Sequence, residues 1–110
     1  MTTASHRVLW APIAREDVWS IVSYILDRDP MNAQRVLERI ERRAETLCSF
    51  PERGRVVPEL RDQGELSYRE LIEDPWRIVY RIDGATVQVV AVLDARRQLE
   101  DLLLDRFLRS

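Results

Sequence analysis

The sequence predicts an α+β fold. A short N-terminal strand and an antiparallel helix hairpin precede three antiparallel strands of one sheet, and a helix follows at the C-terminus. Apolar residues recur at helical spacing in the first half of the chain, and β-rich runs flank turn-forming pairs in the second half. At 110 residues the chain is long enough to bury one core, so we expect residues 1–110 to form a single domain.

The first strand and the first helix are predicted near the N-terminus. Arg7–Trp10 is a brief apolar-rich run that fits a strand. Pro12 opens a helix that ends near Asp27, because proline is tolerated in the first helical turn. The apolar positions of this helix lie on one face and comprise Ala14, Val18, Ile21, Val22 and Ile25.

A second helix follows after a short link. Asp29 is a suitable N-cap and Pro30 a suitable first helical residue, and the helix is expected to reach about Ser49. Its apolar seam comprises Ala33, Leu37, Ile40, Ala44 and Leu47. The short link predicts an antiparallel hairpin of the two helices. The outer face of the second helix mixes acidic and basic residues, which fits a solvated face or a strip that binds a partner.

Three runs in the second half predict the sheet. Trp76–Ile82 and Thr86–Leu93 flank Asp83-Gly84, a strong hairpin signal, and Leu66–Ile72 precedes them across Asp74-Pro75. The region before these strands, which Pro51, Gly54, Pro58 and Gly64 punctuate, is expected to be a loop.

A Leu-rich helix of about three turns is predicted over residues 97–108, with apolar residues at helical spacing. Its apolar surface needs cover from the chain's own core or from another chain, and its own core is the favoured choice. The apolar positions are Leu99, Leu102, Leu103, Phe107 and Leu108, with Leu104 as a further apolar side chain.

Composition restricts the possible functions. The net charge is −2, all 17 basic residues are arginine, and the single Cys48 and His6 offer no metal-ligand spacing. We therefore expect no metal or other cofactor, and direct nucleic-acid binding is doubtful. No apolar run is long enough for a membrane span and no signal peptide is recognisable, so a cytoplasmic protein without membrane contact is expected.

Local sequence words between residues 7 and 98 resemble the ParE/RelE superfamily, the toxins of type II toxin–antitoxin systems. The resemblance favours ParE-like members. The C-terminal helix lies beyond the part that matches. The matching words are Ala14, Asp17, Val18, Ile21, Tyr24 and Ile25, then Pro51-Glu52-Arg53-Gly54-Arg55 with Pro58-Glu59-Leu60, then Tyr68-Arg69-Glu70-Leu71 and Arg77-Ile78-Val79-Tyr80-Arg81, and finally Val89–Leu93 with Arg96-Arg97.

The resemblance implies growth inhibition, plasmid stabilization and neutralisation by a cognate antitoxin, with a homodimer or a toxin–antitoxin hetero-oligomer as the assembly. ParE-like members bind DNA gyrase, whereas RelE-like members are ribosome-dependent nucleases that cut messenger RNA. The antitoxin is expected at the grooves of the helix hairpin and at the exposed sheet edge, since its disordered tail folds along the toxin.

RNA cleavage requires a base, an acid and cations that stabilise the transition state. If the chain is a nuclease, the candidate catalytic residues are Arg77, Glu59, Asp94 and Arg96. Asp94 stands where many relatives have histidine, and Glu70 is a further carboxylate that could serve as a base. An acid beside Arg69 or Arg96, however, is more often part of a structural ion pair. Such pairing lowers the carboxylate pKa and weakens the base.

The arginines suit binding to a target better than catalysis of RNA cleavage, because guanidinium binds carboxylate and phosphate groups through forked contacts. The candidate target-binding residues are Arg55, Arg69, Arg77, Arg81, Arg96 and Arg97. A structural alternative to this role stays open. Arg77 and Arg81 alternate with Ile78 and Ile82, which also fits a sheet with one face open to solvent. Tyr80 would then face the core. We expect Arg77→Ala to abolish toxicity and to leave the fold intact.

The favoured hypothesis is a toxin that inhibits growth by binding a cellular protein, DNA gyrase, and that is neutralised by a cognate antitoxin. The alternatives are a RelE-like messenger RNA endonuclease and a non-toxic remnant that only binds its antitoxin. Fold resemblance alone does not choose among them.

Overall fold

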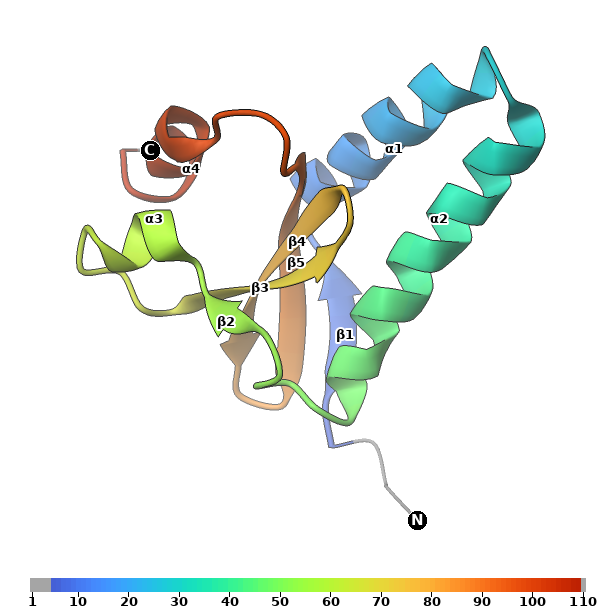
Figure 1. Ribbon diagram of the computed structural model, residues 1–110. Helices are drawn as coiled ribbons and strands as arrows, with labels where there is room; N and C mark the ends of the chain where they lie inside the picture. The colour runs from blue at the N-terminus through green and yellow to red at the C-terminus, as the bar shows by residue number, and fades with distance from the viewer. Residues whose placement is uncertain (1–4, 110) are drawn as a thin grey trace.

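The computed structural model describes residues 5–109 and shows a five-stranded sheet between two helical layers (Figure 1). The sheet has the spatial order β1-β5-β4-β3-β2, with β1 parallel to β5 and the other neighbours antiparallel. The strands are β1 (Arg7–Trp10), β2 (Arg55–Val56), β3 (Tyr68–Glu73), β4 (Trp76–Asp83) and β5 (Thr86–Asp94). The helices are α1 (Pro12–Leu26), α2 (Pro30–Glu45), α3 (Pro58–Arg61) and α4 (Glu100–Phe107), with the 3-10 turn η1 (Thr46–Cys48) after α2.

The helix hairpin confirms the prediction from the apolar spacing. Pro12 and Pro30 stand in the first turns of α1 and α2, and the Asp29 side chain accepts a hydrogen bond from the Asn32 N–H, as an N-cap does. Val36 is buried in α2, whereas Leu37, expected in the seam, is half-buried. The hairpin covers one face of the sheet, where its residues join the larger core cluster (Figure 1).

The three central strands are also confirmed, with small changes at their ends. The β4–β5 hairpin has a two-residue loop, because Asp83 pairs with Thr86, and Gly84 takes a positive φ of 59° at the first loop position. The first of the three expected runs begins at Tyr68 instead of Leu66, and Leu66 is exposed. The Asp74-Pro75 bond between β3 and β4 is cis.

The loop expected between residues 51 and 64 is wrong in part, because that segment contains the edge strand β2 and the short helix α3. Arg55 of β2 pairs with Glu70 of β3, which extends the sheet by one strand. A two-residue strand and a four-residue helix are too short to produce a periodic apolar pattern.

The second face of the sheet is covered at one end by α3 and α4, so this face is not fully open to solvent. A second core cluster of α3, α4 and the sheet contains Val57, Leu60, Val79, Leu93 and Leu103. A register shift at Val79/Tyr80 lets the consecutive residues Val90 and Ala91 both join this cluster.

The C-terminal helix is shorter than expected, since α4 begins at Glu100 instead of residue 97 and has eight residues, about two turns. Its cover comes from the chain's own core, as favoured, because Leu99, Leu103 and Leu104 are buried there. None of the helices that the structure describes is long and apolar enough to cross a membrane.

Candidate functional site

Arg77 is at the centre of a buried ion-pair network on the second face of the sheet. Its two terminal nitrogens each donate to one carboxylate oxygen of Glu59 at 2.7 Å, and its Nε donates to Glu70 Oε1 at 2.6 Å. The Arg77 side chain is only 9% exposed and that of Glu70 is fully buried. The network therefore joins α3, β3 and β4 through three charge-assisted hydrogen bonds.

Arg55 completes this network at the surface. Its Nε donates to the second oxygen of Glu70 at 2.7 Å, while 60% of its side chain is exposed. Two carboxylates and two guanidinium groups thus alternate from α3 to the edge strand β2. This arrangement neutralises the buried charges and holds one exposed arginine at a fixed place.

The network determines which groups can move a proton. The hydrogen bonds from Arg77 lower the pKa of Glu59, although burial acts in the opposite direction. The same contacts raise the pKa of Arg77. A carboxylate held ionised by a forked guanidinium is a weak base, and the guanidinium cannot serve as an acid near neutral pH.

Asp94 and Arg96 form a second pair at the end of β5. Arg96 Nε and Nη2 donate to the two Asp94 oxygens at 3.0 and 2.9 Å, and the Arg96 backbone N–H donates to Asp94 Oδ1. These contacts with Arg96 lower the pKa of Asp94. Asp94 is therefore an ion-pair partner, as expected for an acid beside Arg96. Glu59 is an ion-pair partner of Arg77, which is distant from it in the sequence.

The six arginines predicted to bind a target do not form one patch. Arg81 is exposed, and its Nε donates to Gln88 Oε1 at 3.3 Å on the open end of the second face. Arg69 is half-buried, and its Nη1 donates to the Gly54 carbonyl at 2.8 Å, which ties it to a loop. Arg96 and Arg97 lie beyond β5, in the turn before α4, and both are exposed. The structure thus leaves Arg55, Arg81, Arg96 and Arg97 accessible, and Arg77 buried.

Tyr80 is a core residue, as the sheet alternation suggested. It is fully buried, and its hydroxyl accepts a hydrogen bond from the Gly54 N–H at 2.9 Å. Burial raises the pKa of Tyr80, so the phenol stays neutral. His6, at the start of the described chain, lies 2.7 Å from the Ser5 hydroxyl, through its Nδ1 atom.

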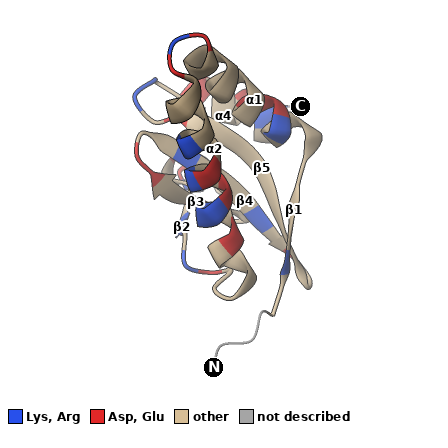
Figure 2. Ribbon diagram, turned by 90° about the vertical axis from the view of Figure 1, so that its right-hand side faces the viewer, with Lys and Arg blue, Asp and Glu red and all other residues tan. Residues whose placement is uncertain are grey.

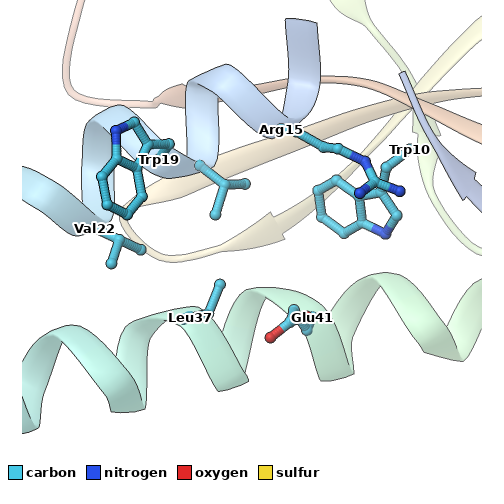
Figure 3. A pocket seen from close by; sticks show the side chains of 7 residues that line it. Trp10, Arg15, Trp19, Val22, Leu37 and Glu41 are labelled. Carbon is cyan, nitrogen blue, oxygen red and sulfur yellow. The ribbon is translucent and has the colours of Figure 1, made fainter. Parts of the chain in front are cut away.

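An open apolar groove of about 360 Å³ lies between α1 and α2 and reaches Trp10 of β1 (Figure 3). Val18 and Val22 of α1 and Leu37 of α2 line it together with two aromatic residues, Trp10 and Trp19. Trp19 is 64% exposed. Arg15 and Glu41 are its polar lining residues.

The aromatic residues of this groove did not emerge as site candidates from the sequence. A tryptophan directly beside the buried face of a predicted amphipathic helix was the available signal, because an exposed Trp there leaves apolar surface uncovered. Trp19 and Trp10 line the same groove only because β1 pairs in parallel with β5, which places β1 at the sheet edge next to the helix hairpin. That pairing is not readable from local patterns.

Asp17 connects α1, β5 and α4. Its Oδ2 atom accepts a hydrogen bond from the Val92 N–H at 3.0 Å, and the Arg106 guanidinium donates to both of its oxygens. Because β1 ends at Trp10, opposite Val89, Asp17 takes the place of a strand partner for the next part of β5. The contact spans 89 residues of sequence, so nothing local indicated it.

Within residues 5–109, no group of three or more His, Cys, Asp or Glu side chains is arranged to hold a metal ion. Residues 8–99 match the family model of the ParE toxin of the type II toxin–antitoxin system, parDE. The chain belongs to this toxin family.

Relatives and a solved structure agree with this assignment. The toxin is 32% identical over 92 residues to Toxin RelE2 of Caulobacter vibrioides, which covers 83% of this chain and 97% of that protein. It is 35% identical over 63 residues to Toxin ParE3 of the same organism, covering 57% of this chain and 59% of that protein. A chain of the chromosomal ParDE TA system from P. aeruginosa superposes with a TM-score of 0.66, covering 84% of this chain and 98% of that one, at 18% identity, a likeness in fold.

Membership of the family implies a cognate antitoxin as the partner of this toxin. α4, at residues 100–107, lies outside the matched part of the chain. The Arg77 network, the groove and Asp17 all lie within it.

Proposed function

We propose that this toxin arrests growth by binding DNA gyrase, without cleaving RNA itself, until its antitoxin removes it from the target. The observation that carries the proposal is the state of Glu59 and Asp94, the two candidate bases that are not fully buried. Glu59 and Asp94 are each held by a forked arginine contact that lowers the carboxylate pKa.

A nuclease that uses the 2′-hydroxyl needs a group that accepts its proton near neutral pH. Lowered carboxylate pKa values work against that role, the chain has no lysine, and the phenol of Tyr80 is buried against Gly54. Net charge of −2 also gives little general attraction to a ribosome. Binding without chemistry makes none of these demands.

The target contacts in this proposal come from the accessible arginines. Arg55 and Arg81 lie on the second face of the sheet, and Arg96 and Arg97 lie beyond the end of β5. Arg77 acts through Glu70, because it binds the same carboxylate that holds Arg55. Arg77 is then a positioning residue for the target-binding surface, and Arg69 supports the neighbouring loop.

The antitoxin in this proposal occupies the groove between α1 and α2. Trp19 and Trp10 offer apolar anchors there, and Val18, Val22 and Leu37 provide a floor. A helix laid into a hydrophobic groove is a common way for a disordered segment to fold on its partner. A helix in this groove leaves the arginine-bearing face of the sheet uncovered. The rest of the antitoxin must therefore block the target sterically from reaching that face.

Induction of the toxin in cells without antitoxin tests the proposal. We expect growth arrest with intact messenger RNA on ribosomes and loss of negative supercoiling in a reporter plasmid. Messenger RNA cut at ribosomal positions would instead support the RelE-like alternative, and normal growth with tight antitoxin binding would support a non-toxic remnant. Arg55→Ala/Arg81→Ala, which removes two exposed cations, should relieve the arrest while the toxin still binds its antitoxin.

A further inference from the structure

The exposed surface of α2 separates its charges into two flanks. Glu38, Glu41 and Glu45 follow a spacing of three and four residues, which places them on the flank beside the groove. Arg39 and Arg43 lie on the opposite flank, next to β3. Figure 2 shows both signs of charge along the outer surface of this helix.

The two flanks differ in whether the structure uses their charges. Arg39 and Arg43 both contact the Glu73 carboxylate at the end of β3, at 2.9 and 3.9 Å. Among residues 5–109, no ion pair involves Glu38, Glu41 or Glu45, and Glu38 accepts only a neutral hydrogen bond from Gln34. The basic flank therefore serves the fold, whereas the acidic flank has no charged partner within the described chain.

The acidic flank meets the apolar groove at Glu41, which lines the groove beside Leu37, and across it α1 presents the exposed indole of Trp19. Glu38 and Glu45 lie next to Glu41 along α2, around a shallow hollow that Arg42 also lines. In Figure 3 the side chains of Leu37 and Glu41 rise from α2 toward the groove. Trp19 and Val22 lie at one end of the groove, and Arg15 and Trp10 lie at the other end, which is the end nearer to Glu41. Arg15 is the cation that faces the groove from α1, and Arg42 lies on α2 next to the three carboxylates.

We infer that Glu38, Glu41 and Glu45 determine which antitoxin the groove accepts, by selecting an amphipathic helix whose α2-facing flank carries Lys or Arg. The inference rests on the proposed use of the groove for antitoxin binding. The apolar stripe of the antitoxin helix packs on Trp19 and the groove floor, and its basic flank lies along the three carboxylates. An antitoxin helix with an acidic flank at that place is rejected by like-charge repulsion.

The size of the effect follows from exposure. Each exposed ion pair changes an equilibrium roughly two- to fivefold, so three pairs together give about tenfold or more. Because these charges are accessible to solvent, salt screens them over about 10 Å at 0.1 M. Selectivity by the flank therefore weakens as salt increases, whereas the apolar contribution of Trp19 persists.

The test measures binding of the cognate antitoxin, co-expressed and then separated, to the full toxin at 50 mM and 500 mM salt. Glu38→Lys/Glu41→Lys/Glu45→Lys should weaken binding at least about tenfold at low salt, and the loss should shrink at high salt. The matched control is Glu52→Lys/Asp62→Lys/Asp83→Lys, which changes net charge equally at exposed residues away from the groove. Circular dichroism melting checks that each variant folds.

Trp19→Ala separates this inference from the proposal beneath it. If Trp19→Ala weakens binding and the triple groove variant matches the control, the groove holds the antitoxin but its acidic flank does not select it. If neither variant differs from wild type, the groove is not the binding site. Restored binding by an antitoxin whose flank is changed from basic to acidic, measured with the triple groove variant, would establish the charge pairing directly.

Discussion

Arg77→Leu should destabilise the fold severely, because it leaves the fully buried Glu70 carboxylate without its principal partner. The substitution removes three charge-assisted hydrogen bonds of 2.6 to 2.7 Å. Removing one partner of a buried ion pair typically costs about 3–5 kcal/mol. A domain of this size has a total stability of about 5–15 kcal/mol, so the loss would be a large fraction of it.

Urea unfolding followed by circular dichroism measures this change. Arg55→Ala is the matched control, because it removes an arginine from the same carboxylate at a side chain that is 60% exposed, and should cost about 1 kcal/mol or less. Arg77→Leu/Glu70→Leu should recover part of the loss, since the fully buried carboxylate is then removed and only Glu59, which is 25% exposed, remains without its arginine. A free energy of unfolding for Arg77→Leu within about 1 kcal/mol of wild type would refute this account of the network.

This result bears on how Arg77 is tested for toxicity. The expectation that Arg77→Ala leaves the fold intact is not compatible with a side chain that is 9% exposed and bound to two carboxylates. Loss of toxicity in that variant would not distinguish lost target contact from lost structure. Arg55→Ala and Arg81→Ala, at exposed residues, answer the question about target binding more cleanly.

Four further predictions concern the same scaffold. The pKa of Glu59 is lowered from its ordinary value of 4.5, so its ion pair stabilises the fold above about pH 4.5 and this contribution is lost as the pH falls through the lowered pKa. Glu59→Gln should therefore make the urea midpoint less dependent on pH on the acid side. Gly54→Ala should destabilise by about 1–3 kcal/mol or more in thermal melts, since the new Cβ would lie 2.5 Å from the Glu70 carbonyl oxygen and 2.6 Å from the Tyr80 hydroxyl. Tyr80→Phe should cost about 1–3 kcal/mol, because the Gly54 N–H loses its acceptor; an unchanged melting temperature would mean that water replaces the phenol. Deleting residues 99–110 should lower solubility or antitoxin binding, as it uncovers the cluster around Leu60 and Leu93, and unchanged behaviour on both counts would exclude a packing role for α4.

Much of the fold could be predicted because its long elements have strong periodic patterns. The apolar spacing in α1 and α2 and the turn residues around Gly84 identified the hairpins and most of their boundaries. The edge strand β2 and the helix α3 were missed, because two and four residues cannot establish a period. The covering of the second sheet face depends on these short elements, so the burial of Arg77 was also beyond prediction.

The candidate site was predicted as a set of residue types and not as an arrangement. The sequence indicated that an acid beside Arg69 or Arg96 would be a structural ion-pair partner, and Asp94 does pair with Arg96. Glu70, the neighbour of Arg69, is also an ion-pair partner, but its arginines are Arg55 and Arg77. The bridge from Arg77 through Glu70 to Arg55 requires the β2–β3 register, which no local pattern specifies. The contact of Arg106 with Asp17 likewise joins residues that only the tertiary fold brings together.

A supercoiling assay with purified gyrase measures the proposed action of this toxin, which is binding to gyrase without cleavage of RNA. Relaxed plasmid, gyrase and ATP are incubated with increasing toxin, with and without a stoichiometric amount of antitoxin. We expect supercoiling to fall as toxin increases and to recover with antitoxin, while messenger RNA on purified ribosomes stays intact at the same toxin concentrations. Undiminished supercoiling together with cleaved messenger RNA would contradict it.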